Sequence, residues 1–215
     1  YGNYVRKRQG KPPSMTPRKH EQIAFDVFEY GIYKRRLLEG EDPEKSDDWI
    51  TGHPIIFPYI LAVGDYSRPS FQIRVPVDDT HTLHYWYNTQ LREPGAPPQQ
   101  EVELRDVPYI HKNGRLVVET INGQDMMAWV TQGDISDRTT ERLGTSDKGV
   151  ILFRNVILEQ IEKVERGEDP MGVIRDPGKN EPYIQIAREG VALGAFNIDR
   201  TATTAEDRAV RAQAT

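Results

Sequence analysis

Asp125 is the residue of this sequence whose type and setting most clearly suit chemistry. Apolar residues fill the next five positions, 126–130. A carboxylate in apolar surroundings costs roughly several kcal/mol unless it is paired with a cation or bound to a metal ion. If residues 124–132 are helical, Asp125, Trp129 and Gln132 share one face. Three roles are open on this pattern alone: Asp125 caps a helix, pairs with an arginine, or binds a metal ion.

A long helix is predicted after this segment, over residues 149–167. Apolar residues recur there at intervals of three and four positions, with charged residues opposite them. The apolar stripe comprises Val150, Phe153, Val156, Ile157 and Ile161. Ser146 or Asp147 is suited to begin this helix, and Gly167 is suited to end it.

Strand-like patterns precede the helix, because β-branched and aromatic residues alternate or cluster there. The segments are residues 23–31 and 32–40 (two strands or a bent one), 53–64, 71–79 and 80–91. Pro54 and Pro58 place the segment 53–64 near a sheet edge or a bulge. We therefore predict an α+β fold, in which an antiparallel sheet is followed by a long C-terminal helix.

The two ends of the chain lack periodicity. Residues 1–20 are basic and rich in glycine and proline, which predicts a loop. Residues 199–215 are small and polar, which predicts a flexible C-terminal tail. A chain of 215 residues suits one large domain or two small ones, and we expect a domain over residues 21–198.

Composition argues against several classes of protein. The net charge of -5 argues against nucleic acid as the main partner. The absence of cysteine rules out disulfides, thiol nucleophiles, thiolate zinc sites and any iron–sulfur cluster held within this chain. No apolar run approaches about 18 residues, so we predict no membrane span and expect a cytoplasmic location.

The five histidines do not form a convincing metal site in the sequence. His81 and His84 are three positions apart, and such residues point to opposite faces of a strand. We expect them to have structural or pocket-lining roles. His53 precedes a proline and is expected to close a loop, whereas His20 and His111 lie among charged residues and are expected to face solvent.

Aromatic residues in the predicted strands are candidates for the wall of a substrate pocket. A sheet curved around a long helix encloses a cavity, and such cavities are usually apolar with a few polar groups. Strand alternation selects Phe57, Tyr59 and Tyr85, and Trp129 joins them as the neighbour of Asp125 on a helix face. The alternative is that these aromatic side chains only pack in the core.

Five segments of the chain carry a resemblance to a known family. They are HPIIFPYIL, PVDDTHTLHYWY, GQD, SDRTTERLGTSDKGV and FRNVILEQI, which succeed one another within residues 20–170. In this order they resemble the C-terminal catalytic part of Rieske-type aromatic-ring oxygenase alpha subunits, in the branch of phthalate dioxygenases and aromatic O-demethylases.

The resemblance implies both a fold and a function. The implied fold is the helix-grip architecture (START/Bet v 1-like), with the sheet wrapped around the long helix. Asp125 would be the carboxylate ligand of a mononuclear Fe(II) that uses O2 to hydroxylate or O-demethylate an aromatic, carboxylated substrate. The implied partners are an electron-donating reductase or ferredoxin and further copies of the subunit in a homotrimer.

Two motifs of the family are absent from this sequence. The Cys-x-His and Cys-x-x-His segments that bind the Rieske [2Fe–2S] cluster do not occur, nor does the Asp-x-x-His-x4-His segment that supplies two histidines to the iron. Residues 1–4 resemble the stretch shortly after the second of those histidines. We therefore expect the cluster and both histidines in a missing N-terminal part, with residues 1–20 as the loop that comes after the iron-ligand segment.

Two other hypotheses come from different classes of protein. Helix-grip folds also bind hydrophobic small molecules without any metal ion, so the chain could be a non-catalytic binding module. It could also be a structural subunit that lacks a site. A buried Asp125 facing a cavity would favour the oxygenase, and an Asp125 that caps a helix would favour the alternatives.

Overall fold

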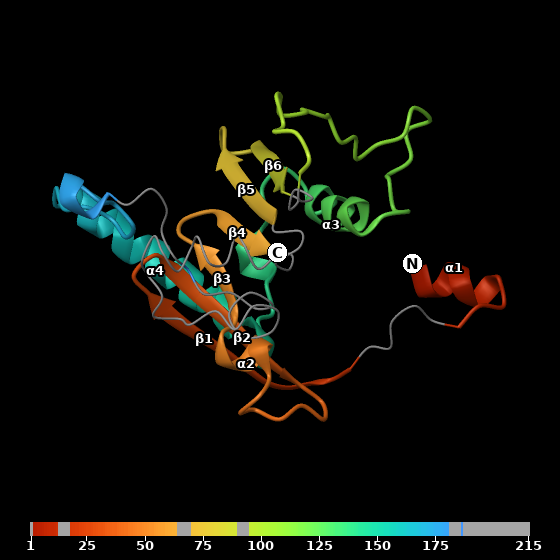
Figure 1. Cartoon of the computed structure of the whole chain (residues 1–215), viewed down its shortest axis with the longest axis horizontal. Coiled ribbons are helices and arrows are strands. Elements are labelled where there is room, and N and C mark those ends of the chain that lie inside the picture. Colours follow the sequence, from red (N-terminus) through yellow and green to blue (C-terminus); the bar gives the residue numbers. More distant parts are fainter. Residues whose placement is uncertain (1, 13–17, 64–69, 90–94, 181–185, 187–215) are drawn as a thin grey trace. The chain divides into compact units, whose positions relative to one another are not determined.

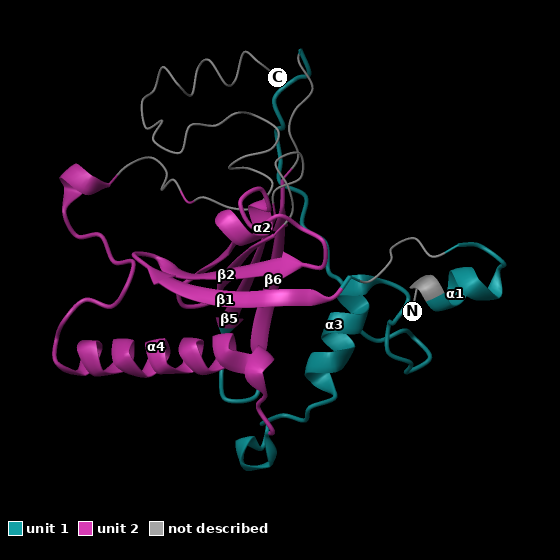
Figure 2. Cartoon of the chain, turned by 90° about the horizontal axis from the view of Figure 1, so that it is seen from below, with its two compact units in different colours: residues 1–18, 76–81, 95–141 teal, residues 19–75, 82–94, 142–215 magenta. Residues whose placement is uncertain are grey.

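The computed structural model describes residues 2–12, 18–63, 70–89, 95–180 and 186. The chain forms two compact units (Figure 2). Unit 1 comprises residues 1–18, 76–81 and 95–141, and unit 2 comprises residues 19–75, 82–94 and 142–215. The extent of a catalytic domain over residues 21–198 stays a prediction. The tail expected over residues 199–215 lies outside the described residues.

A six-stranded sheet forms the main part of unit 2 (Figure 1). Its strands succeed one another in chain order: β1 (His20–Phe28), β2 (Gly31–Leu38), β3 (His53–Ile56), β4 (Ile60–Val63), β5 (Ser70–Pro76) and β6 (Thr82–Asn88). The pairs from β1–β2 to β4–β5 are antiparallel. The predicted α+β class is therefore confirmed. Residues 53–64 differ from expectation, since a turn at Phe57–Pro58 divides them into two strands.

Gly31 shows why the β1–β2 hairpin needs its particular turn. The hairpin closes with Phe28 opposite Gly31, and Gly31 has a φ of 154°. A side chain at this position would place its Cβ 1.9 Å from the backbone oxygen of Ile55 on β3. Only glycine lets β3 approach β2 this closely.

Arg35 on β2 fastens the loop between β2 and β3 to the sheet. This loop contains the one-turn helix α2 (Asp47–Ile50). The Arg35 guanidinium donates to the backbone oxygens of Trp49 and Ile50, and its Nε lies 2.5 Å from Asp26 Oδ2. The carbonyl groups at the end of α2, which have no hydrogen-bond donor within the helix, thus accept hydrogen bonds from Arg35.

The long helix α4 (Lys148–Glu165) lies alongside β1 (Figure 2). It begins after Asp147, and the chain leaves it in the left-handed conformation at Gly167, as the sequence predicts. Its buried stripe includes Val156 and Gln160, which are 5% and 3% exposed. The predicted stripe is wrong at two positions, because Val150 and Ile161 are exposed. Val150 directly follows Gly149, and Ile161 directly follows Gln160. One residue along a helix is a rotation of about 100°, so these two side chains point away from the buried side of α4.

The described part of unit 1 contains two α-helices, α1 (Gly2–Arg8) and α3 (Ile121–Val130), and a short 3-10 helix at Arg138–Thr140. The expectation of a loop throughout residues 1–20 is wrong for α1. The Arg8 guanidinium lies 6.0 Å from the centre of the Tyr4 ring, one helical turn earlier. Arg6, Lys7 and Arg8 also fall in the last turn, where positive charge favours a helix.

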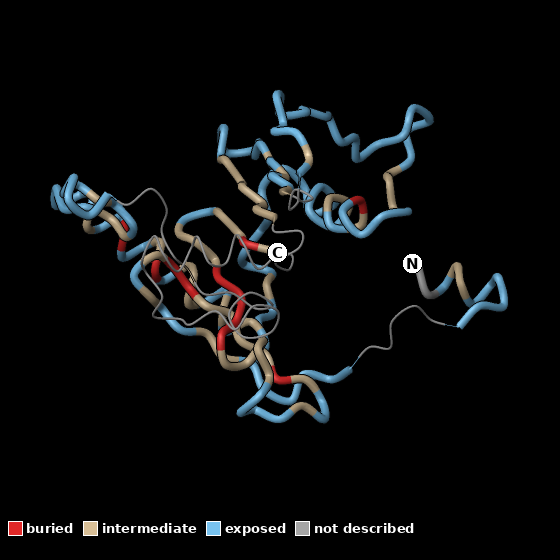
Figure 3. Tube along the Cα trace, in the orientation of Figure 1, coloured by how far each residue is buried: buried red, intermediate tan, exposed pale blue. Residues whose placement is uncertain are grey.

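Buried residues concentrate in unit 2 (Figure 3). Its core contains Ile32, Leu37, Ala62 and Val156, whereas Gly123 is the one buried residue among those described in unit 1. Within the described residues, 24 large hydrophobic side chains are exposed. The described residues of unit 1 therefore bury almost no apolar core. None of the described helices has the length and apolar character needed to cross a membrane.

Candidate functional site

Asp125 lies in the second turn of helix α3. The helix begins after Thr120, whose side-chain oxygen accepts a hydrogen bond of 3.0 Å from the Gly123 amide. Thr120 is thus the N-cap residue, and the capping role left open for Asp125 is excluded. Among the described residues Asp125 forms no ion pair, so the arginine-pairing role finds no support there either.

The Asp125 side chain is exposed in this structure, which differs from the expected apolar burial. The reason is its position on the helix. Gly123 packs inward, and a residue two positions later lies about 200° around the axis, on the opposite side. The apolar neighbours in sequence, Met126 and Met127, are half-buried on other sides of α3 and do not enclose the carboxylate.

Apolar side chains nevertheless flank Asp125 on its own face of the helix. Ile121 lies one turn before it and is 76% exposed, and Trp129 lies one turn after it and is 38% exposed. The expected grouping of Asp125 with Trp129 on one face is therefore found. A carboxylate between two exposed apolar side chains is a surface suited to being covered by another part of a protein.

The start of α3 is held by close contacts to the preceding strand-like segment. A Cβ on Gly123 would lie 2.4 Å from the backbone oxygen of Val117, so only glycine allows this approach. The Gln124 side-chain amide donates to the backbone oxygen of Val118 at 3.0 Å. These contacts place the backbone beside Asp125 on a firmly attached element, which suits a metal ligand.

The end of α3 is satisfied by side chains just beyond it. The Thr131 hydroxyl donates to the Met127 oxygen at 2.7 Å, and the Gln132 amide donates to the Ala128 oxygen at 3.0 Å. These bonds supply the donors that the last turn of a helix lacks. Gln132 thus caps its own helix, so its amide is engaged there instead of beside Asp125.

The histidines do not form a metal site in the described part of the chain. That part contains no group of three or more His, Asp or Glu residues that could hold a metal ion. His53 is 9% exposed at the start of β3, and the His84 ring contacts Trp86 with centroids 4.8 Å apart. His20 and His111 are exposed, as expected.

His81 is part of the turn between β5 and β6. Its Nδ1 lies 2.9 Å from Asp78 Oδ1, and the same oxygen accepts from the amides of Thr80 and His81 at 2.8 Å. The Thr80 amide and the His81 side chain are the largest causes that lower the pKa of Asp78 to about 2. His81 therefore has the structural role expected for it.

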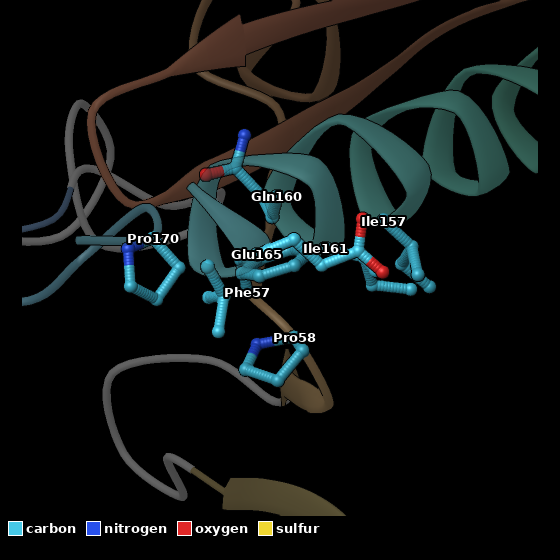
Figure 4. A pocket seen from close by; sticks show the side chains of 8 residues that line it. Phe57, Pro58, Ile157, Gln160, Ile161, Glu165 and Pro170 are labelled. Atoms are coloured by element: carbon cyan, nitrogen blue, oxygen red, sulfur yellow. The ribbon is translucent and has the colours of Figure 1, made fainter. Parts of the chain in front are cut away.

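An apolar pocket of about 360 Å³ lies in unit 2 (Figure 4). Phe57 and Pro58, from the turn between β3 and β4, face the C-terminal half of α4 across it. The remaining lining residues are Ile157, Gln160, Ile161, Val164, Glu165 and Pro170. This volume suits a small organic molecule, at the lower end of the range for ligand pockets.

The predicted pocket residues are only partly brought together. Phe57 lines the pocket, whereas Tyr59 and Tyr85 lie outside its lining and are 39% and 47% exposed. Trp129 belongs to unit 1 with Asp125. Sequence reasoning missed Ile161 and Val164 as lining residues, because the pattern assigns Ile161 to the predicted packing stripe and makes no prediction for Val164.

The chain has clear relatives among characterised proteins. Residues 104–183, which include α3 and α4, match the family described as "LigXa C-terminal domain like". The chain is 34% identical over 198 residues to the 5,5'-dehydrodivanillate O-demethylase oxygenase subunit of Sphingobium sp. (strain NBRC 103272 / SYK-6). It is also 34% identical over 124 residues to the phthalate 4,5-dioxygenase oxygenase subunit of Pseudomonas putida.

These matches confirm the resemblance found in the sequence, because both relatives are oxygenase subunits and the matched family is described as a C-terminal domain. The first match covers 90% of this chain and 45% of the relative, and the second covers 46% of this chain and 28% of the relative. The chain thus spans less than half the length of either relative. Asp125 and the whole of α3 lie within the matched family segment.

Proposed function

We propose that the chain is the catalytic part of an oxygenase subunit that uses O2 and a mononuclear Fe(II). The reaction would hydroxylate or O-demethylate an aromatic, carboxylated substrate. The names of the two relatives support both reaction types, since one is an O-demethylase subunit and the other a dioxygenase subunit.

The observation that carries the proposal is the match of the chain to two oxygenase subunits, and the candidate iron ligand within the matched family segment is Asp125. Its carboxylate projects from a capped, firmly attached helix, and neither a helix cap nor an ion pair with a described residue occupies it. Non-haem iron sites combine one such carboxylate with two histidines and leave positions open for oxygen and substrate. The carboxylate of Asp125 fits this requirement, and the two histidines would come from outside this chain.

The Fe(II), when bound, would supply the centre at which O2 reacts with the substrate. Asp125 would contribute one negative charge and one fixed direction of coordination. Ile121 and Trp129, one turn to either side, would exclude water from the carboxylate once another part of the protein covers them. The contacts of Gly123 and Gln124 would keep α3 from rotating when the metal ion binds.

Further features of the complete enzyme belong to the same proposal. The sheet and α4 would form a helix-grip domain, in which α4 lies in the concave face of the sheet. A Rieske [2Fe–2S] cluster outside this chain would deliver electrons received from a reductase or ferredoxin. The subunits would assemble as a homotrimer in the cytoplasm.

The proposal is tested by replacing Asp125 with alanine in the complete subunit. The mononuclear iron should be lost, with Fe(II) affinity reduced more than about 100-fold, beyond the range seen for groups outside the coordination sphere. The absorbance of the Rieske cluster should stay unchanged. Iron content and Fe(II) binding by equilibrium dialysis are the measurements, and turnover should be lost with the iron.

Asp134→Ala is the matched control, because Asp134 is an exposed aspartate just beyond the same helix. It should leave iron content and turnover at the level of the unmodified enzyme. An Asp125→Ala subunit that keeps its iron and its activity would return Asp125 to the role of an ordinary surface residue.

A second candidate function is favoured by the apolar pocket between Phe57 and α4. A non-catalytic module could bind a hydrophobic small molecule there without any metal ion. The Asp125→Ala subunit separates the two functions. A non-catalytic binding module would bind its ligand in the pocket as tightly as before the substitution. An oxygenase would lose turnover, even if the pocket still bound its ligand.

A further inference from the structure

A short hairpin precedes the helix that carries Asp125. Ile110 and Leu116 pair across it, and the Val117 amide donates to the Tyr109 oxygen at 2.9 Å. The turn is closed by the His111 amide, which donates to the Arg115 oxygen at 2.8 Å. Gly114 has a φ of +80°, which this turn requires. Residues 109–117 thus form a defined element of unit 1.

Glu119 ties this hairpin to the segment that enters α3. Its Oε2 lies 3.1 Å from His111 Nε2 and accepts a hydrogen bond of 3.0 Å from the Val118 amide. Its Oε1 lies 3.6 Å from an Arg115 guanidinium nitrogen. The His111 side chain is the main cause that holds the pKa of Glu119 below its usual value. One carboxylate therefore contacts both sides of the hairpin turn and the backbone beside it.

The position of Glu119 in the chain makes these contacts relevant to Asp125. Glu119 directly precedes Thr120, the N-cap of α3. On its other side, Val118 accepts from the Gln124 side chain, and Gln124 is the immediate neighbour of Asp125. A rotation of α3 about its axis would break the Gln124 bond or press Gly123 into Val117.

We propose that Glu119 is a positioning residue for the iron-binding carboxylate. By joining His111 and Arg115 to the backbone at Val118, it fixes the direction in which α3 presents Asp125. This inference rests on the proposed role of Asp125 as an iron ligand. Glu119 itself would not touch the metal ion or the substrate.

The exposure of the Glu119 cluster separates positioning from general stability. The Glu119 and His111 side chains are each 42% exposed, and exposed ion pairs contribute little to the stability of a whole domain. Loss of the Glu119 carboxylate should therefore leave the fold intact and loosen only the attachment of α3. The effect should appear in iron affinity and in local hydrogen exchange, whereas the melting temperature should stay the same.

The test uses the complete, iron-loaded subunit with Glu119→Ala. Fe(II) affinity, measured by equilibrium dialysis, should fall about tenfold, the lower end of the range for groups that orient metal ligands. Amide hydrogen exchange of a peptide covering residues 120–130 should become faster. The same increase should be seen when the metal-free protein is measured. The melting temperature and the Rieske absorbance should match those of the unmodified subunit.

Two further variants make the test specific. Glu119→Gln should restore most of the iron affinity, because its amide oxygen can still accept from the Val118 amide and from His111. Glu103→Ala removes another exposed glutamate of unit 1, one that pairs with Arg105 at 2.7 Å and touches neither the hairpin nor α3. It should leave iron affinity and hydrogen exchange unchanged.

The possible outcomes are distinguishable. If Asp125→Ala loses iron but Glu119→Ala binds Fe(II) normally, the positioning role is wrong and the proposed function stands. Faster exchange in residues 120–130 without any loss of affinity would also overturn it, since Glu119 would then be merely structural. If Asp125→Ala retains iron, the proposed function fails and the positioning role fails with it.

Discussion

At the scale of single residues, Asp78 is the carboxyl group most strongly shaped by its surroundings among the described residues. Backbone amides of Thr80 and His81, the Thr80 hydroxyl and the His81 ring all contact its Oδ1. Each of these donors favours the ionised form of Asp78, because a protonated carboxyl group would accept fewer of these hydrogen bonds. The turn between β5 and β6 is thus organised around one negative charge.

Asp78 should titrate at a pKa of about 2 in the folded protein, below the usual value of 3.8. Because the folded pKa is the lower one, the stabilisation from Asp78 is complete above pH 3.8 and disappears as the pH falls through about 2. Carbon-13 NMR of the Asp78 carboxyl group would measure this. In Thr80→Ala the pKa should stay lowered but move upward, since the hydroxyl is lost and the amide bond remains. An Asp78 that titrates at its usual pKa would contradict the turn geometry.

Asp125 shows which part of a site can be predicted from sequence. The helix around it can be predicted from local patterns, and its shared face with Trp129 results from the helical period. Its exposure could not be predicted, because it depends on which side of α3 packs inward. That side is set by Gly123 against Val117, and nothing in the local sequence marks that contact in advance.

At the scale of elements, the contact between α4 and β1 depends on the absence of a side chain at Gly149. A Cβ at this position would lie 2.2 Å from Cε1 of the Phe25 ring. The sequence predicts the bounds of α4 within about two residues, because the cap and the terminating glycine are local signals. The sequence pattern wrongly places Val150 and Ile161 on the buried side. The apolar stripe of this helix is wide, and the pattern alone does not show which of its residues contact the sheet.

Gly149→Val should weaken the docking of α4 on β1 by about 1–3 kcal/mol, because the added methyl groups overpack the contact. Native-state hydrogen exchange of the α4 amides in the complete subunit would measure the free energy of local opening. The same substitution should cost less in a Phe25→Ala background, where the ring no longer occupies the space. Equal costs in both backgrounds would show that Phe25 is not the neighbour that matters.

At the scale of the whole molecule, the described residues bury few of their apolar side chains. The core contains four buried hydrophobic residues, and exposed ones occur on β6, α3 and α4 alike. The antiparallel order of the sheet was predictable from turn signals between strand-like segments. The division into two units was not, since each unit combines segments far apart in the sequence. We expect the apolar face of α3 around Asp125 to be covered in the complete subunit.

The most direct measurement is the crystal structure of the complete, iron-loaded subunit, with anomalous diffraction recorded at the iron edge. We predict an anomalous peak, separate from the Rieske cluster, about 2.0–2.2 Å from a carboxylate oxygen of Asp125, the distance typical of such oxygens on a divalent zinc ion. Two histidines from outside residues 1–215 should complete the site. A mononuclear iron bound elsewhere, with Asp125 still facing solvent, would contradict the proposed role of this carboxylate.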